Sequence, residues 1–269
     1  MELPAKLAPG LDEKAIDAHV EALQRAAHAG DAPTDDDRLV RLVAVHAVEY
    51  KEAMPDEKVA VLASGGLDSA VLVAHLAERA QVQPIYVRFG LRWEEVEEAH
   101  LRVYLGALAR PAVRPLVTLR EPIDDLYGAH WSVSGDGVPD ASTPDEAVFL
   151  PGRNLLLLSK ASVWCALNGF SAIALGVLKG NPFPDATPAF CRGAEVALGE
   201  ALERPLRVLT PFGEMTKREV LALGRALPLE RSFSCIAPDG GRHCGRCNKC
   251  AERRRAFAAL ELRDGTPYA

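Results

Sequence analysis

The fold is decided by residues 58–80, which read KVAVLASGGLDSAVLVAHLAERA. An unbroken apolar run from Val59 to Ala63 leads into a pair of glycines, and a helical pattern of apolar residues follows. A buried strand that passes through a tight turn into a helix is the opening unit of a parallel α/β sheet. We therefore predict a strand, a loop and a helix, in this order.

Strand patterns and helix patterns continue to alternate downstream. Further strands are predicted at residues 82–89, 112–119 and 171–177, and helices at residues 93–108 and 155–169. Residues 121–146 contain several Gly, Pro and Asp residues and are predicted to form a loop region. This alternation predicts an α/β fold with a doubly wound parallel sheet, whose ligands bind at the carboxyl ends of the strands.

The chain is predicted to have three parts. Residues 1–57 are alanine-rich, and their DAPTDDD run suits a helix N-cap, so we expect a helical N-terminal extension used for packing or dimerisation. The second helix of this extension would turn Leu39, Leu42, Val43, Val45 and Val48 toward a core. Residues 58–230 form the α/β domain, and residues 231–269 form a C-terminal metal-binding segment.

Composition narrows the class of protein. The chain has 269 residues, 48% of them hydrophobic and 25% charged, which is ordinary for a soluble globular protein. Its net charge of -6 argues against a protein that coats nucleic acid through a broad basic surface. No apolar stretch is long enough to span a bilayer, because Leu155–Leu158 meets Lys160 almost at once. The N-terminus lacks an export pattern, so we expect a cytoplasmic location with reduced cysteines.

The hexapeptide Ser64-Gly65-Gly66-Leu67-Asp68-Ser69 lies where the first strand gives way to the first helix. The two glycines let backbone amides face an anion, the helix presents its positive end, and the two serine hydroxyls add donors. The residue count and the missing lysine exclude a GxxxxGK[ST] loop. The alternative is a plain glycine turn in which Asp68 and Ser69 cap the helix.

Four cysteines follow a C-x8-C-x2-C-x2-C pattern: Cys235, Cys244, Cys247 and Cys250. The short spacings, eased by Gly245, let the sulfur atoms converge, and four thiolates make a closed tetrahedral zinc site of structural type. An iron–sulfur cluster and free buried thiols are the alternatives. Cys165 and Cys191 are interpreted as ordinary small apolar residues, and His243 as a weaker ligand than the thiolates.

The SGGLDS loop and the cysteine segment together resemble the zinc-containing 7-cyano-7-deazaguanine synthases of the ATP pyrophosphatase, or PP-loop, superfamily. The resemblance extends to FGLRWEEVEEA at residues 89–99, LPGRNLLLLS at residues 150–159, LTPFGEMTKREVLALG at residues 209–224 and RRRAF at residues 253–257. It covers about residues 58 to 258 and leaves the N-terminal extension outside.

This resemblance implies an enzyme of the queuosine pathway. The family uses ATP to convert 7-carboxy-7-deazaguanine and ammonia first to an amide and then to a nitrile, through adenylated intermediates. It implies ATP, Mg²⁺ and Zn²⁺ as cofactors and a homodimer as the assembly. By the same resemblance Asp68 would hold magnesium or organise the loop, and Arg153 and Lys217 would be cationic groups of the ATP region, although either could be an ordinary surface charge.

The expected substrate residues lie where the chain departs from the family. After Gly176-Val177 the family has an acidic stretch like DYSGYPDCRPEF, whereas this chain has LKGNPFPDATPAF. Phe183 and Asp185 persist, and the Asp185 carboxylate can accept paired hydrogen bonds from a guanine-like edge, unless it is a plain loop aspartate. Trp93 replaces the family's histidine and could stack on a ring or simply pack.

The departures keep other functions open. The enzyme could stop at the amide, or join a deazaguanine acid to another amine or to a protein. A PP-loop enzyme that modifies tRNA is a further alternative, favoured only by the basic run at residues 253–255, which we expect to be a solvated helix face. A zinc-binding interaction module without ATP binding is the last alternative.

Overall fold

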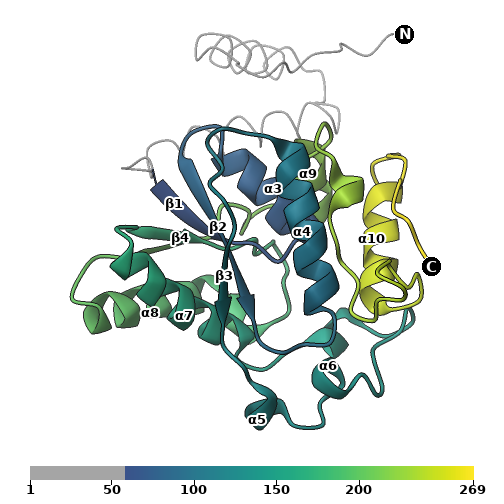
Figure 1. The fold of residues 1–269 in the computed structure, drawn as a ribbon, viewed down its shortest axis with the longest axis horizontal. Coiled ribbons are helices and arrows are strands. Elements are labelled where there is room, and N and C mark those ends of the chain that lie inside the picture. Colours follow the sequence, from purple (N-terminus) through teal and green to yellow (C-terminus); the bar gives the residue numbers. More distant parts are fainter. Residues whose placement is uncertain (1–57) are drawn as a thin grey trace, which may run out of the picture. The chain divides into compact units, whose positions relative to one another are not determined.

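Five parallel strands form the centre of the part of the chain that the structure describes, residues 58–269 of a computed structural model (Figure 1). The strands are β1 (Lys58–Leu62), β2 (Gln81–Arg88), β3 (Val117–Arg120), β4 (Ala172–Ala174) and β5 (Arg207–Leu209). The sheet order is β3-β2-β1-β4-β5, which confirms the predicted doubly wound parallel sheet. The helical extension predicted for residues 1–57 lies outside the described residues.

Helices connect the strands and follow the sheet. They are α3 (Leu67–Leu76), α4 (Glu94–Leu108), α5 (Asp124–Tyr127), α6 (Trp131–Ser134), α7 (Arg153–Leu167), α8 (Pro188–Ala201), α9 (Lys217–Leu223) and α10 (Asn248–Ala258). Three short 3₁₀ helices are η1 (Asp145–Val148), η2 (Pro184–Ala186) and η3 (Leu229–Arg231). Among the described residues, none of these helices could cross a bilayer.

The order of the strands creates a crevice at the middle of the sheet. β1 pairs with β2 on one side and with β4 on the other, and the chain proceeds outward from β1 in both directions. Right-handed crossovers place α3 and α4 on one face and α7 and α8 on the other, as Figure 1 shows. The carboxyl ends of β1 and β4 therefore diverge at the topological switch point, where ligands of such folds bind.

Burial explains why the first strand and helix form. Val59, Ala60 and Val61 have no exposed surface, because helices cover both faces of a parallel sheet. Tyr104 of α4 is also fully buried, and its hydroxyl donates a hydrogen bond to the Ala70 carbonyl of α3 at 2.8 Å. The helices on this face are thereby fixed against each other behind the glycine loop.

Some predicted elements differ from those in the structure. Residues 121–146 contain α5, α6 and part of η1 rather than an open loop. β5 and α8 were not predicted; α8 begins at Pro188, after Thr187 caps it by accepting a hydrogen bond from the Phe190 amide at 3.1 Å. β3 is shorter than expected because Pro115 has no amide hydrogen for the sheet.

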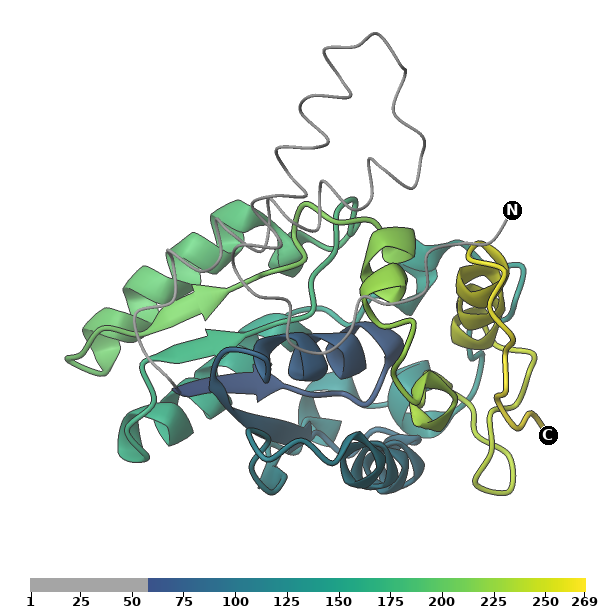
Figure 2. The same cartoon turned by 90° about the horizontal axis from the view of Figure 1, so that it is seen from above.

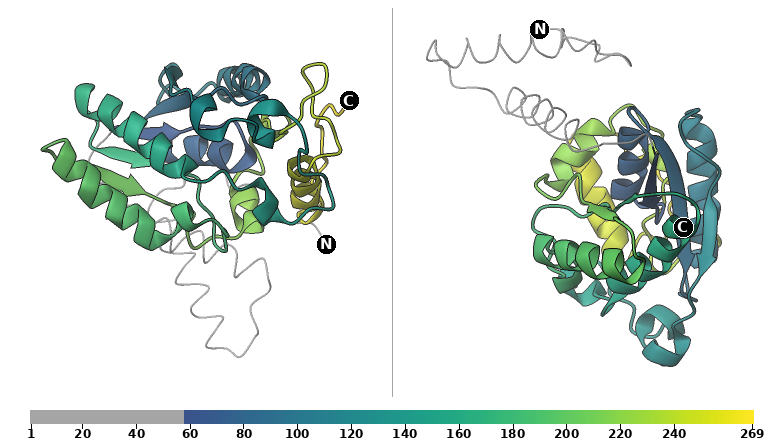
Figure 3. Two further views of the ribbon diagram at one scale, coloured as in Figure 1. Left: turned by 90° about the horizontal axis from the view of Figure 1, so that it is seen from below. Right: turned by 90° about the vertical axis from the view of Figure 1, so that its left-hand side faces the viewer.

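The basic run in α10 is not a solvated face, because Arg253 is 1% exposed. Its guanidinium donates to the Leu229 carbonyl at 2.7 Å, to the Ser232 hydroxyl at 2.8 Å and to the Thr266 hydroxyl at 2.7 Å. The expected solvated helix face is confirmed only for Arg254 and Arg255, which are exposed. Figure 2 shows α10 beside α9, and Figure 3 (left) shows it at the opposite end of the sheet from α8.

Arg253→Met should lower the free energy of unfolding by about 3 kcal/mol, because it leaves three buried acceptors without a charged donor. Arg255→Met, on the same helix and exposed, is the matched control and should change it by less than about 0.5 kcal/mol. Urea unfolding of zinc-loaded protein measures both. Equal stability of the two variants would contradict a structural role for Arg253.

Candidate functional site

A cavity of about 230 Å³ lies at the switch point of the sheet. Its walls come from the ends of β1, β2 and β4, the glycine loop, the start of α7 and the segment before α8. Seven of the predicted site residues line it: Ser64, Gly66, Asp68, Ser69, Arg153, Phe183 and Asp185. Four others do not: Gly65, Leu67, Trp93 and Lys217. Segments distant in sequence thus meet at one concave site.

The glycine loop leaves the first turn of α3 without a capping side chain. Gly65 adopts φ +83°, a left-handed conformation that favours glycine, and Gly66 is the N-cap residue with no side-chain cap. The Ser69 hydroxyl donates to the Gly66 carbonyl at 3.1 Å, and the Ser64 and Ser69 hydroxyl oxygens are 3.2 Å apart. Asp68 and Ser69 therefore do not cap α3, and its positive end faces the cavity.

The Gly66 amide is already engaged, since it donates to the Ser64 hydroxyl in a long hydrogen bond of 3.3 Å. Gly65 is buried and Gly66 is half-buried. An anion in the cavity would therefore be held mainly by the amides at the beginning of α3 and by the serine hydroxyls.

The Asp68 carboxylate, which lines the cavity, forms an ion pair with a lysine. The Lys217 ammonium, at the start of α9, lies 2.6 and 2.9 Å from the two Asp68 carboxylate oxygens and 2.8 Å from a Glu252 oxygen of α10. Although burial opposes it, Asp68 and Glu252 raise the pKa of Lys217 above its ordinary value. Burial likewise acts against the charge of Glu252, but Lys217 and Lys249 hold its pKa down at about 2. Lys217 and Glu252 are therefore both charged at neutral pH.

Arg153 brings a positive charge to the cavity at the first residue of α7. Its Nε is buried and has no hydrogen-bond partner among the described residues. Two buried carboxylates, Glu94 and Glu97, lie in its electrostatic field. This guanidinium is suited to an anionic ligand, because its buried Nε donor is already desolvated and has no partner among the described residues.

Glu97 is 7% exposed, and the Tyr86 hydroxyl donates a hydrogen bond of 2.8 Å to its carboxylate. Burial raises the pKa of Glu97 to about 7, although the Arg153 charge and the Tyr86 hydroxyl act in the opposite direction. Its neighbour Glu94 instead accepts the Phe89 and Gly90 amides at 2.7 and 2.9 Å and thereby fixes the turn after β2.

The opposite wall of the cavity holds Asp185 in a reciprocal pair. Its Oδ2 accepts the Asn154 amide at 2.9 Å, and the Asn154 side chain donates to the Asp185 carbonyl at 3.0 Å. One carboxylate oxygen is thus committed to the start of α7. Phe149 and Phe183 stack nearby with ring centroids 5.2 Å apart. Sequence reasoning missed Phe149 and Asn154; the PGRN block could have indicated the asparagine, but no signal marks the phenylalanine.

Trp93 lies away from the cavity walls. It is 3% exposed, precedes α4 and stacks on Trp131 of α6, with ring centroids 5.7 Å apart. Of the two roles the sequence left open, packing fits this position. A part in substrate binding remains a prediction.

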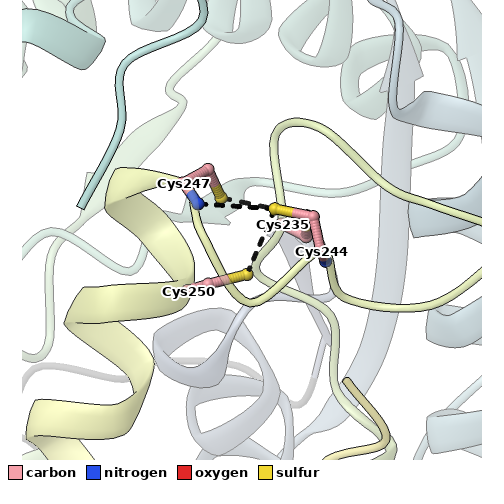
Figure 4. Close-up of side chains that lie close together, drawn as sticks. All are labelled: Cys235, Cys244, Cys247 and Cys250. Atoms are coloured by element: carbon pink, nitrogen blue, oxygen red, sulfur yellow. Dashed lines mark hydrogen bonds between the residues drawn. The ribbon is translucent and has the colours of Figure 1, made fainter. Parts of the chain in front are cut away.

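The four cysteines form one buried cluster, whose ligand atoms all lie within 4.8 Å of one another. Two sulfur pairs, Cys235–Cys247 and Cys244–Cys250, are 3.8 and 4.0 Å apart. Four thiolates around one zinc ion at about 2.3 Å would lie about 3.8 Å apart, so the cluster fits a single tetrahedral ion. A cluster of several iron atoms would separate its ligands further. Figure 4 shows the Cys235, Cys247 and Cys250 sulfur atoms turned toward one another.

Backbone amides support the cluster and join it to the glycine loop. The amides of Cys244, Arg246 and Cys247 donate to cysteine sulfurs at 3.3 to 3.4 Å, which favours thiolates and hence metal binding. Two residues before the first cysteine, the Phe233 amide donates to the Gly65 carbonyl at 2.7 Å. The metal-binding segment thereby contacts the loop that lines the cavity.

Comparison with known families agrees with this geometry. Residues 58–261 match the family model described as queuosine biosynthesis protein QueC. The chain belongs to the QueC family. The matched residues include the glycine loop, the PGRN turn and all four cysteines. The predicted family is confirmed.

Curated relatives cover most of the chain. It is 32% identical over 214 residues to 7-cyano-7-deazaguanine synthase 1 of Desulfitobacterium hafniense, covering 77% of this chain and 94% of that protein. It is 33% identical over 222 residues to the 7-cyano-7-deazaguanine synthase of a Ruegeria species, covering 79% and 93%. A solved structure described as a predicted subunit of a tRNA methyltransferase from Methanocaldococcus jannaschii aligns with a TM-score of 0.40 and 14% identity, covering 69% and 94%.

Purified protein should contain a single zinc ion per chain and be colourless. Cys247→Ser should lose most of this metal and unfold at a lower temperature, because one of four ligands is removed from a site that contributes folding energy. Cys165→Ala, which alters a buried cysteine outside the cluster, should keep the zinc. Metal analysis checks both variants, and a brown protein that contains iron would contradict the zinc assignment.

Stability should depend on pH through Glu97. Its pKa of about 7 in the folded chain exceeds the ordinary value of 4.5, so the folded state binds the proton more tightly, and stability present at low pH is lost as the pH rises through 7. Between pH 4.5 and 7.5 the wild type should lose on the order of 3 kcal/mol relative to Glu97→Gln. Urea unfolding across this range measures the difference. Glu95→Gln, exposed on the same helix, should follow the wild type.

Proposed function

We propose that the chain is an ATP-dependent carbon–nitrogen ligase that converts 7-carboxy-7-deazaguanine and ammonia to 7-cyano-7-deazaguanine in queuosine biosynthesis. Membership of the QueC family and relatives named 7-cyano-7-deazaguanine synthase support this proposal. The observation that carries it is the cavity where the uncapped start of α3, the Arg153 guanidinium and the Asp185 carboxylate meet.

The cavity combines groups for a polyphosphate with groups for a base-like ring. The amides of α3 and the hydroxyls of Ser64 and Ser69 would hold the pyrophosphate of ATP, and Arg153 would stabilise charge on the phosphates or on the acid. Magnesium, when bound with ATP, would neutralise phosphate charge, and Asp68 is the candidate carboxylate for it.

The reaction needs positioning rather than a side-chain nucleophile. A carboxylate oxygen of the acid attacks the α-phosphorus of ATP, and pyrophosphate leaves. Ammonia then attacks the acyl carbon, AMP leaves, a proton is released, and the amide forms. In a second round the amide oxygen attacks another ATP, and loss of AMP and of the remaining nitrogen protons leaves the nitrile. AMP is a far better leaving group than hydroxide, so the protein contributes by holding the reactants in line.

On the substrate side, Phe183 and Asp185 are the candidate contacts. The stacked rings of Phe149 and Phe183 offer an apolar surface for a planar heterocycle, and the second carboxylate oxygen of Asp185 is available to a ring N–H donor. Asn154 would then act by fixing this carboxylate from the start of α7.

A second candidate is a relative that stops at the amide or uses another amine. The altered stretch at residues 177–190 favours it, because Phe183 and Asp185 of that stretch line the cavity. Both versions of the proposal include the homodimer that the family resemblance implies and the cytoplasmic location that the sequence predicts.

The test is to incubate the zinc-loaded protein with ATP, magnesium, ammonia and 7-carboxy-7-deazaguanine and to identify products by mass spectrometry. The nitrile and AMP are expected. Amide without nitrile would favour the second candidate, and no ATP consumption with the acid would contradict both.

Arg153→Met should reduce kcat in this assay by about 10² to 10³, because it removes a desolvated cation aimed at charge that develops on the phosphates. Lys160→Met, a half-exposed charge later on the same helix, is the control and should keep kcat within about twofold. An Arg153→Met enzyme with unchanged kcat would show that this guanidinium is not part of the reaction.

A further inference from the structure

The Lys217 ammonium connects the glycine loop with helix α10. It lies between Asp68, in the first turn of α3, and Glu252, in α10. Glu252 also accepts from Lys249 at 2.7 Å, so the two lysines and two carboxylates form one neutral group. The side chains of Lys217, Asp68 and Glu252 are each only about a quarter exposed, at 25%, 25% and 23%.

Glu252 stands on the helix that carries the last cysteine ligand. Cys250 and Glu252 are two residues apart in α10, and Arg253 next to them is clamped by Leu229 and Ser232. The position of the Glu252 carboxylate is therefore set by the metal cluster and by a buried guanidinium. A carboxylate on such a fixed element can hold a flexible lysine in one place.

We infer that Glu252 is a positioning residue for the nucleotide site, which it reaches through Lys217 and Asp68. Lys217 has four rotatable side-chain bonds, and with Asp68 as its only partner its ammonium could follow the loop in many conformations. With Glu252 as a second, rigidly held partner, the ammonium has one position, and Asp68 at the start of α3 is fixed with it. The zinc segment thus orders the phosphate loop through side chains as well as through the Phe233 amide.

The inference rests on the proposed function for its effect on ATP, but the coupling itself does not need ATP. The substitution Glu252→Gln replaces the carboxylate with an amide of the same size and thereby removes the negative charge. Hydrogen exchange of the amides at residues 65–69 should become about tenfold faster, with the zinc content unchanged. The Kd for ATP with magnesium should rise about tenfold, which corresponds to about 1.4 kcal/mol.

The decisive measurement is a double-mutant cycle with Lys217→Met. If Glu252 acts through Lys217, Glu252→Gln should change the Kd and the loop exchange by less than about twofold once Lys217 is already methionine. Glu230→Gln, the same substitution at a half-exposed site outside α10, should leave both quantities at the wild-type values.

Two outcomes would overturn the inference: unchanged loop exchange in Glu252→Gln, or an equal effect of this substitution with and without Lys217. Loss of zinc from Glu252→Gln would also count against it, because the effect would then come from the metal site. A wild type that binds no ATP while loop exchange still follows the cycle would refute the proposed function and leave the coupling standing.

Discussion

The uncapped start of α3 is the constraint on which the rest of the structure depends. Backbone amides at a helix start require partners, and among the described residues no side chain caps α3, although the Ser64 hydroxyl accepts the Gly66 amide at 3.3 Å. The glycine pair, the left-handed Gly65 and the Ser64–Ser69 contact keep this end open toward the cavity. The parallel sheet places it at the switch point, where β1 and β4 separate and where Arg153 and Asp185 arrive from other elements.

The cysteine segment is a second centre of order, and it is built differently. Its sulfur atoms are arranged for one tetrahedral ion, its amides face the sulfurs, and a buried arginine fixes the chain on either side. None of these groups reaches the cavity. The segment instead contacts the glycine loop: the Phe233 amide donates to the Gly65 carbonyl, and the Lys217 ammonium joins Glu252 of α10 to Asp68, which lines the cavity. A structural metal site can in this way affect a reaction from a distance.

The sequence predicted the elements whose structure depends on residues close together in the chain. β1 and α3 follow from an apolar run and a glycine pair, and the cysteines follow from their spacing. β5 has three residues, too few to show a period, and was missed. Arg253 was expected in solvent because its acceptors, such as Thr266, come from other segments of the chain. The pairing of Asp185 with Asn154 is likewise tertiary, so sequence suggested a carboxylate but not its orientation.

The contact between Phe233 and Gly65 is made by main-chain atoms alone. Every amino acid except proline carries this amide hydrogen, so the contact tolerates almost any change of side chain at position 233. What restricts position 233 is the ring instead, which is fully buried and has its centroid 4.8 Å from that of His100 and 4.5 Å from that of His243. Proline at this position would remove the main-chain hydrogen bond and the ring packing together.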